Sequence, residues 1–369
     1  MSKQNVCAWD LEGPISVLDF AAELGRMLSK KSELGLQNYD MGEFFIMISN
    51  YDDYLIDTPG VKEKLGIPEY QPGDTLRLMA PFYAACFSDN ELLELAEKNL
   101  GLLPGCETLM KILQKEWNVY VISTSYTHFA HTVTGYLEIP KENVYCTDLN
   151  IHELKKKAKN IKLYADILVK EIFQKYLDNN KSLDVVLDDL NNFFWKNSNS
   201  DYITIMNHVQ VRGGKRKELA IEDISKRTGV PISEMIAIGD SITDINMLQR
   251  LKDEGGIAVS FNGNRFTIKR ATVAVTTPNN LGILPIFYAK RNIEDFLSKW
   301  EKNYEHFKNN PKKIVDSLIP NKIKELFIKY DFVPEIYNLD NKTEKELEEI
   351  RERQEKMRKF VRGWAGNLG

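Results

Sequence analysis

Short apolar runs alternate with amphipathic helical stretches along much of the chain. The run from Val6 to Trp9 predicts a buried strand, and a second run in "NVYVIST" predicts another. Further strands are predicted in "ENVYCTDL", "EMIAIGDS", "GGIAVSF" and "ATVAVTT", with helical patterns such as "ETLMKILQKEW" and "KRKELAIEDISKRTGV" between them. This alternation favours an α/β fold in which helices cover both faces of a parallel sheet.

Long helical segments interrupt this pattern and divide the chain into four predicted units. Strands and helices alternate in the discontinuous pieces 1–13, 104–151 and 203–290, which we expect to form one core. Residues 14–103 predict a helical unit, and 152–202 predict a second helical insert. Strand character returns in "DYITIMNHVQVRGG". Residues 291–369 predict a charged helical extension, in which "TEKELEEIRERQEKMRKFVRGW" pairs opposite charges at i,i+4.

Composition excludes some classes of protein. The net charge is −4, and no basic stretch is interleaved with aromatics, so we expect no nucleic-acid partner. No apolar stretch approaches the roughly eighteen residues that span a bilayer, and the first residues carry no signal-like segment. The 4 cysteines form no CxxC pair, which is typical of reduced thiols. These features predict a cytoplasmic protein.

Two carboxylates follow the first predicted strand. Asp10 and Glu12 stand two residues apart, and Gly13 permits a sharp turn that would aim both at one place. An aspartate can attack phosphorus to form an acyl phosphate, and a neighbouring carboxylate can move protons. An acidic turn is the alternative, and the short motif alone favours that alternative.

Three further clusters lie at strand ends or helix starts. Ser123 and Thr124 follow a strand, where hydroxyls either bind phosphate or cap a helix. The basic residues 215–217 begin a helix, where positive charge opposes the helix dipole unless an anion is bound. Asp240 and Asp244 are spaced to share a helix face, as oxygen ligands for Mg²⁺ or as a cap and a surface residue. Together the four clusters supply what phosphoryl transfer needs.

The four clusters, in this order, resemble the motifs of the haloacid dehalogenase superfamily, most closely its phosphoserine-phosphatase-like branch. "WDLEG" is similar to the first motif, "VISTS" to the second, the lysine helix to the third and "GDSITD" to the fourth. The resemblance covers residues 5–150 and about 203–285. It implies a Rossmann-like core, a helical cap at 14–103, and Mg²⁺-dependent hydrolysis through an aspartyl phosphate.

The resemblance assigns the catalytic and metal-binding residues. Asp10 would be the nucleophile, and Glu12 the general acid and base. Asp10, Asp240, Asp244 and the backbone carbonyl of Glu12 would hold Mg²⁺. The family usually has Asp where this chain has Glu12, and the added methylene predicts slow or narrow activity, because a displacement near 1 Å can cost about a hundredfold in rate.

The resemblance also assigns binding residues for the phosphate. Ser123 and Thr124 would contact it, and Asn262 in "VSFNGN" lies where the branch often has a phosphate-binding Asn. Lys217 fits the third motif better than Lys215 by its spacing to the rest of its helix, although both remain candidates.

Two residues of the predicted cap match positions that contact the rest of the substrate in phosphoserine phosphatases. Asp19 lies at the offset of a residue that meets an amine, and Arg77 could bind a carboxylate. A surface charge on a cap helix is an equally good interpretation of each.

Three functions remain open at this point. The first is a phosphatase acting on a small phosphorylated metabolite. The second is an accessory subunit with little catalysis, because the chain also resembles archaeal members of the superfamily described as energy-converting hydrogenase A subunit R. Its helical insert or C-terminal extension would then meet a protein partner. The third is transfer of the phosphoryl group to an acceptor other than water.

Overall fold

A seven-stranded sheet forms the centre of the protein, in the order β3-β2-β1-β4-β5-β6-β7. The computed structural model describes residues 5–196, 200–340 and 342–368. The first six strands are parallel, and β7 pairs antiparallel with β6. The strands are β1 (Asn5–Trp9), β2 (Trp117–Tyr126), β3 (Val144–Thr147), β4 (Met235–Gly239), β5 (Ile257–Phe261), β6 (Val273–Thr276) and β7 (Glu335–Asn338).

Both faces of the sheet are buried, as expected for parallel strands. Successive side chains of β1 point to opposite faces, so Val6 and Ala8 pack with α13 (Lys215–Thr228) and α14 (Ile245–Glu254). Trp9 faces the other side, where it stacks on Phe287 of α15 (Leu284–Ala289) at 6.0 Å between ring centroids. Helices α6 (Cys106–Leu113) and α7 (Thr127–Tyr136) also pack on that second side. The prediction of an α/β fold with helices on both faces is confirmed.

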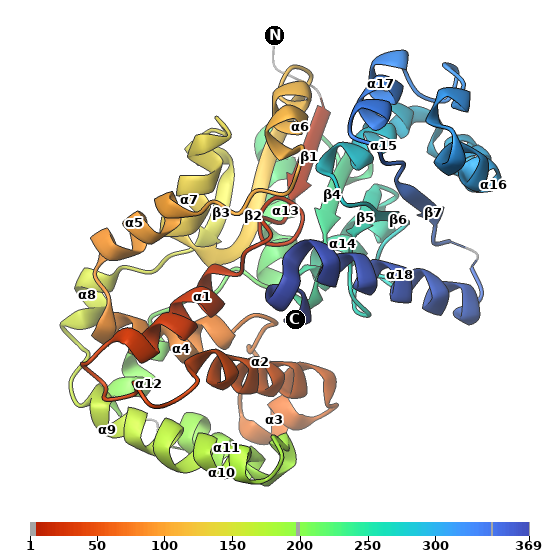
Figure 1. The fold of residues 1–369 in the computed structure, drawn as a ribbon. Helices are drawn as coiled ribbons and strands as arrows, with labels where there is room; N and C mark the ends of the chain where they lie inside the picture. The colour runs from red at the N-terminus through yellow and green to blue at the C-terminus, as the bar shows by residue number, and fades with distance from the viewer. Residues whose placement is uncertain (1–4, 197–199, 341, 369) are drawn as a thin grey trace.

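The two predicted helical insertions pack together as a second lobe, which lies below the core in Figure 1. The first contributes α1 (Phe20–Met27), α2 (Met41–Asp57), α3 (Val61–Leu65) and α4 (Thr75–Cys86). The second contributes α8 (Ile151–Lys155), α9 (Ile161–Ala165), a π-helical stretch (Asp166–Phe173), α10 (Gln174–Asp178), α11 (Leu187–Trp195) and α12 (Asp201–Met206). Phe44 of α2 meets Phe173 edge-on at 5.5 Å, and the Tyr202 hydroxyl donates to the Leu78 carbonyl of α4. We call this lobe the cap.

Helix α5 (Asp89–Lys98) belongs to the first helical segment but lies beside the core helix α7. Its first residue, Asp89, is 2.8 Å from His128 of α7. The segment 14–103 is therefore not wholly in the cap.

The strand expected in "DYITIMNHVQVRGG" is wrong. The segment forms α12 and then a loop that leads into α13. Ser200 caps α12 by accepting a hydrogen bond from the Ile203 amide, and Tyr202 and Ile203 are buried against the cap. The β-branched residues suggested a strand, but packing against α4 stabilises a helix here.

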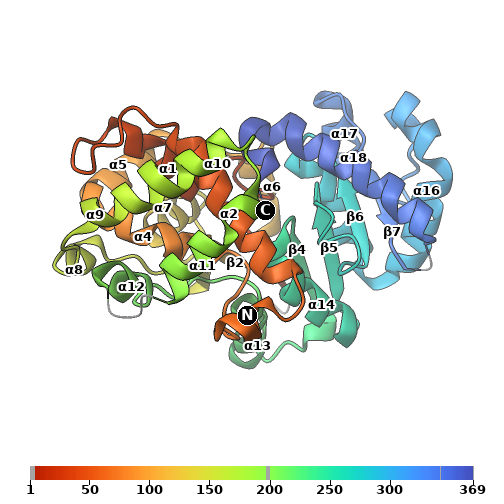
Figure 2. The ribbon, with the colours of Figure 1, turned by 90° about the horizontal axis from the view of Figure 1, so that it is seen from below.

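The C-terminal extension is helical with one exception. It contains α16 (Ile293–Asn309), α17 (Asn321–Lys329) and the predicted long helix α18 (Glu344–Arg362). The exception is β7, whose 4 residues are too few to give a clear alternating pattern and which extends the sheet at the β6 edge. In Figures 1 and 2 α18 runs along the core toward the cap, and the C-terminus lies at the junction of the two lobes.

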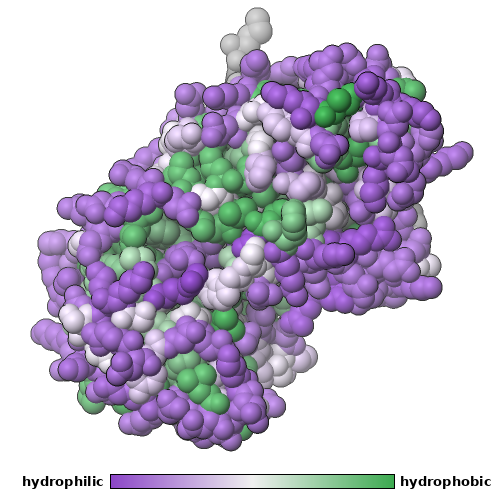
Figure 3. Space-filling view, in the orientation of Figure 1, coloured by the Kyte–Doolittle hydropathy of each residue, from purple (hydrophilic) through white to green (hydrophobic). Residues whose placement is uncertain are grey.

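Apolar side chains gather between the lobes on the face drawn in Figure 3, and the outer ends of that face are mostly hydrophilic. Among the helices of the described residues, none is long and apolar enough to cross a membrane.

Candidate active site

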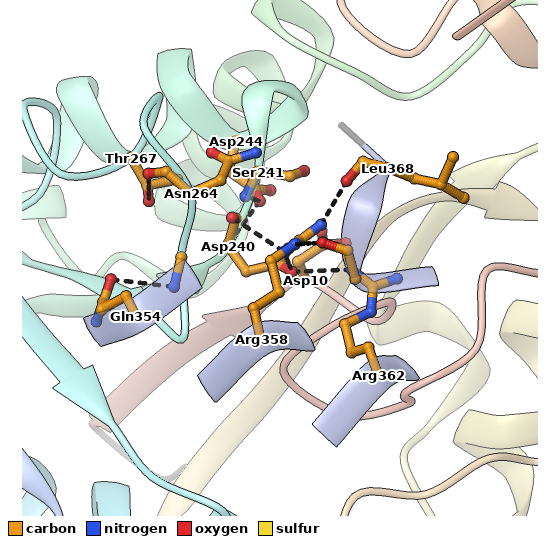
Figure 4. Close-up of polar contacts among 12 residues, drawn as sticks. Asp10, Asp240, Ser241, Asp244, Asn264, Thr267, Gln354, Arg358, Arg362 and Leu368 are labelled. Atoms are coloured by element: carbon orange, nitrogen blue, oxygen red, sulfur yellow. Dashed lines mark hydrogen bonds and ion pairs between the residues drawn. The ribbon is translucent and has the colours of Figure 1, made fainter. Parts of the chain in front are cut away.

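The predicted catalytic residues meet at the carboxyl edge of the sheet, where α/β folds bind ligands. Asp10 follows β1, and Asp240 follows β4, the strand next to it. Thr124 lies near the end of β2 on the other side of β1, and Lys217 lies in the first turn of α13. Figure 4 shows Asp10, Asp240 and Asp244 close together.

Lys217 links two of the carboxylates inside the protein. Its side chain is fully buried, and Nζ lies 2.8 Å from Asp10 Oδ1 and 2.7 Å from Asp244 Oδ1. Burial alone would lower the pKa of Lys217, but attraction by both aspartates raises it above its usual value, so the ammonium stays charged. Lys215 instead pairs with Glu218 at the surface. The geometry therefore favours Lys217 over Lys215.

Asp10 is buried and oriented by hydrogen bonds to one of its two oxygens. Oδ1 accepts from the Leu11 amide at 2.7 Å and from Lys217, and Oδ2 has no partner among the described residues. Burial raises the pKa of Asp10 well above its usual range, with a further contribution from Asp244, and Lys217 opposes the shift. The arrangement presents one oxygen, Oδ2, to an incoming group.

Three carboxylates form a cluster that fits a divalent cation. Oxygens of Asp10, Asp240 and Asp244 lie within 4.8 Å of one another, and all three residues are buried. Asp244 Oδ2 is held by the amides of Asp240 and Ser241, at 2.9 and 3.1 Å. Asp240 Oδ1 is buried without a hydrogen-bond partner among the described residues. An unpaired buried oxygen among hard oxygen donors suits Mg²⁺.

Gly13 brings the turn after β1 against this cluster. A Cβ atom there would lie 2.0 Å from Asp240 Oδ2, and the φ angle of +118° is one that L side chains rarely adopt. Both observations require glycine at this position. The turn therefore depends on Gly13 for its close approach to the carboxylates.

Glu12 lies at the start of the first cap helix. Its Oε1 accepts a hydrogen bond from the Phe20 amide at 2.8 Å. Burial, reinforced by repulsion from Asp19, raises the pKa of Glu12 to about 8. The carboxyl therefore holds a proton at neutral pH, as a general acid requires. The Glu12 side chain lies outside the three-carboxylate cluster, and its backbone carbonyl as a metal ligand stays a prediction.

The hydroxyl residues of the second motif differ in their surroundings. Thr124 lines the cavity above the carboxylates and donates to the Arg212 carbonyl at 3.2 Å. Ser123 is fully buried, and its Oγ accepts from the Ser125 amide at 3.0 Å. Of the two, Thr124 is the one that borders the cavity.

Asn262, which is predicted to contact the phosphate, uses its side-chain amide in hydrogen bonds to the backbone. Its side chain donates to the Thr277 carbonyl at 2.8 Å and accepts from the Thr277 amide at 2.9 Å. Both polar atoms of the amide thus connect the ends of β5 and β6. Asn262 is buried and is not among the residues that line the cavity, so the arrangement gives it a structural role.

The two predicted specificity residues differ in whether they line the cavity. Asp19 lines the cavity and caps α1 by accepting from the Ala22 amide at 2.9 Å. Arg77 is buried in the cap between the Tyr70 and Trp195 rings, 3.6 Å from Asp74, and it is not among the cavity-lining residues. The aromatic contacts give Arg77 a packing role in the cap, and its contact with substrate stays a prediction.

The cavity lies between the core and the cap and is open to solvent on one side. Its cap side includes Phe45, Ser49 and Asp53 of α2, and its core side includes Asp10, Glu12, Thr124 and Ser241. Two arginines of α18, Arg358 and Arg362, complete the wall.

Both arginines lie in the segment that the sequence predicted as a charged helical extension, without any role in the site. The overlooked signal is that Ile350, Gln354, Arg358 and Arg362 recur every four residues and form the buried face of α18.

Asp52 of α2, on the cap side of the cavity, should make stability depend on pH. It accepts hydrogen bonds from the Tyr70 hydroxyl at 2.6 Å and the Gly73 amide at 2.9 Å. Burial nevertheless raises the pKa of Asp52 from 3.8 to about 8. Between pH 3.8 and about 8 the folded protein keeps the Asp52 proton, whereas the unfolded chain releases it. The contribution of Asp52 to the free energy of unfolding therefore falls as the pH rises through this range. The fall is up to about 1.4 kcal/mol per pH unit.

We expect Asp52→Asn to weaken this pH dependence, since the neutral amide replaces the protonated carboxyl. Thermal unfolding from about pH 5 to pH 8 should show a smaller loss of melting temperature in the variant than in the wild type. The exposed Asp188 of α11 provides the control, and Asp188→Asn should follow the wild type. Equal slopes for Asp52→Asn and the wild type would contradict the prediction.

Several known proteins are similar to this chain. Residues 105–287 match the family model of haloacid dehalogenase-like hydrolases. A gene product from Archaeoglobus fulgidus is similar over 99% of both chains, with 25% identity and a TM-score of 0.69. A phospho-aspartyl intermediate analogue of phosphoserine phosphatase is 15% identical with a TM-score of 0.45, and a substrate-bound phosphoserine phosphatase is 14% identical with a TM-score of 0.44. Each covers 77% of this chain and 98% of its own. No curated protein matches the sequence.

Proposed function

Because the chain belongs to the haloacid dehalogenase superfamily, we propose that it hydrolyses a small phosphomonoester through an aspartyl phosphate on Asp10. The observation that carries the proposal is the buried contact of Lys217 with both Asp10 and Asp244. A buried lysine shared by two aspartates would serve a packing role poorly, because desolvating these charges is costly. It serves phosphoryl transfer well, because charge must be neutralised where the phosphate binds.

The first step assigns a function to each oxygen of Asp10. Oδ1 is fixed by Lys217 and the Leu11 amide, and Oδ2 attacks phosphorus. The P–O bond to the leaving alcohol breaks as the Asp10–phosphoryl bond forms. Glu12 gives its proton to the departing oxygen. Asp10, Asp240 and Asp244 would hold Mg²⁺, which when bound supplies positive charge to the phosphoryl oxygens.

The second step uses the same residues in reverse. Glu12, now ionised, takes a proton from a water molecule that attacks the phosphorus of the aspartyl phosphate. The Asp10–phosphoryl bond breaks, inorganic phosphate leaves, and Glu12 is again protonated. The cap covers the carboxylates from the other side of the cavity and limits the access of bulk water to this chemistry.

Phosphate release from a panel of small phosphomonoesters tests the proposal. The assay is run with Mg²⁺ and with a chelator, and the Asp10→Asn protein is the matched control. Metal-dependent release by the wild type supports the proposal. Absence of turnover across the panel, together with a stable protein complex recovered from native lysate, would favour an accessory subunit.

Glu12 should matter most for substrates with poor leaving groups. Glu12→Gln keeps the shape of the side chain but removes the proton, so we expect kcat for alkyl phosphates to fall by about 10²–10⁴. The loss should be much smaller for para-nitrophenyl phosphate, whose leaving group needs no proton. The wild-type rate with alkyl phosphates should also decline as pH rises through about 8, as Glu12 ionises.

The control for Glu12 is Glu23→Gln, on the exposed face of α1. It should leave kcat and its pH profile unchanged for both substrates. Equal losses for the two leaving groups in Glu12→Gln would rule out Glu12 as the general acid.

A further inference from the structure

Helix α18 packs over the carboxyl edge of the sheet, and hydrogen bonds from its buried face hold it there. Gln354 is fully buried, and its Oε1 accepts from the Ser260 hydroxyl at 2.7 Å and the Gly263 amide at 3.0 Å. Its Nε2 donates to the carbonyls of Ser260 and Val275, at 2.9 and 3.1 Å. Every hydrogen-bonding atom of this amide is used on β5, β6 or the loop between them, which fixes the helix in register with the site (Figure 4).

Arg358 and Arg362 lie one and two turns after Gln354 on the same face of α18. Both contact a single oxygen of Asp240. Arg358 Nη1 donates to Asp240 Oδ2, and Arg362 Nη1 lies 3.1 Å from the same oxygen. Both side chains are almost completely buried, with 3% and 4% of their surface exposed. Figure 4 shows both guanidinium groups directed at this carboxylate.

Backbone carbonyls accept from further donors of both arginines, and Arg358 Nη1 also donates to the Asp240 carbonyl at 3.2 Å. Arg358 donates to the carbonyls of Gly366 and Leu368, at 3.3 and 2.8 Å. Arg362 donates to the carbonyls of Val17 and Leu18, at 3.3 and 3.5 Å. Guanidinium groups whose donors are held by fixed acceptors are rigid supports. Most of their donors are used within the protein, and the carboxylate that both arginines contact is Asp240.

The two oxygens of Asp240 therefore have different environments. Oδ2 accepts from both arginines, and Oδ1 is the buried oxygen without a partner among the described residues. We propose that Arg358 and Arg362 are positioning residues of the metal centre, which hold Asp240 through Oδ2 so that Oδ1 is presented as a ligand. The inference rests on the proposed function, and it makes the C-terminal extension part of the active site.

Metal affinity separates positioning from a simple effect of charge. Removing a positive charge beside a carboxylate should by itself strengthen cation binding. Losing a group that orients a metal ligand weakens it, typically by 10–100-fold. The two effects have opposite signs, so the direction of the change identifies which one dominates.

Direct titration with Mn²⁺, followed by electron paramagnetic resonance, tests the inference without requiring turnover. The proteins are the wild type, Arg358→Lys, Arg358→Gln and Arg362→Lys. We expect Arg358→Gln to bind Mn²⁺ about 10–100-fold more weakly than the wild type. The Mn²⁺ affinity of Arg358→Lys should lie between those of the wild type and Arg358→Gln, because a lysine keeps the positive charge but lacks the planar set of donors of a guanidinium group. Lys359→Gln, which removes a charge from the exposed neighbour, is the matched control and should bind as the wild type does.

The melting temperature with and without Mn²⁺ provides a second test that also applies to variants that fold poorly. The rise in melting temperature on adding Mn²⁺ reports binding to whatever protein is folded, and it should shrink in the order wild type, Arg358→Lys, Arg358→Gln. Unchanged or tighter Mn²⁺ binding by the Arg358 variants would overturn the inference while leaving the phosphatase proposal intact. A wild-type protein that binds no divalent cation would overturn the metal centre and this inference together.

Discussion

The Asp10→Asn protein is expected to release phosphate from no substrate at a measurable rate, with a loss on the order of 10⁴-fold or more. The amide is isosteric and its oxygen can still accept from the Leu11 amide, which lies 2.7 Å from Oδ1 in the wild type. It lacks the anionic oxygen that must attack phosphorus, because Oδ2 becomes a nitrogen that carries two hydrogens. The change removes the nucleophile and keeps the shape of the site.

Two measurements establish that the loss is chemical. Phosphate release is followed for the wild type and the variant at equal concentration, and circular dichroism compares their folds. Acid quenching during turnover of a labelled substrate should trap phosphate covalently on the wild type and not on Asp10→Asn. Release that survives the substitution, or label on the variant, would exclude Asp10 as the nucleophile.

The second large effect is expected at Lys217. Lys217→Met keeps an unbranched apolar stem but removes the charged Nζ, which lies within 2.8 Å of Asp10 and Asp244. We expect kcat to fall by about 10²–10³, as for the loss of one preorganised electrostatic group. The free energy of unfolding should also fall by about 3–5 kcal/mol, since two buried carboxylates lose their shared cation.

Lys215→Met is the matched control, because Lys215 begins the same helix and is half exposed. Its effect on stability should stay within about 0.5 kcal/mol, and its kcat should equal that of the wild type. Steady-state kinetics and urea unfolding of both variants give the comparison. A larger loss of activity in Lys215→Met than in Lys217→Met would reverse our assignment of the phosphate-binding lysine.

The parallel core could be predicted because its strands carry the signal within themselves. Each of β1, β4 and β5 is a run of apolar residues buried on both faces, and a turn or a helix start follows it directly. The meeting of the candidate catalytic clusters could be predicted for the same reason. Parallel strands place their carboxyl ends at one edge, so residues after separate strands meet without any knowledge of side-chain packing.

The errors fall where packing outweighs local preference. The segment 201–206 has β-branched residues but forms α12 because the cap buries it as a helix. Strand β7 is defined by pairing with β6 and not by its own 4 residues. The roles of Asn262 and Arg77 stay predictions from spacing, and the structure adds the contacts of Asn262 with Thr277 and of Arg77 with two aromatic rings.

The sequence by itself determined the α/β core, and it predicted the carboxyl edge as the candidate site with Asp10, Glu12, Asp240 and Asp244 as its candidate acidic residues. Only the tertiary structure decided between Lys217 and Lys215, joined the two helical insertions into one cap, and brought Arg358 and Arg362 to Asp240. The physical reason is the separation in sequence over which each interaction acts. Strand burial and helix spacing act between neighbours in the chain, whereas the contact between Arg358 and Asp240 joins residues 118 positions apart and exists only when α18 is docked.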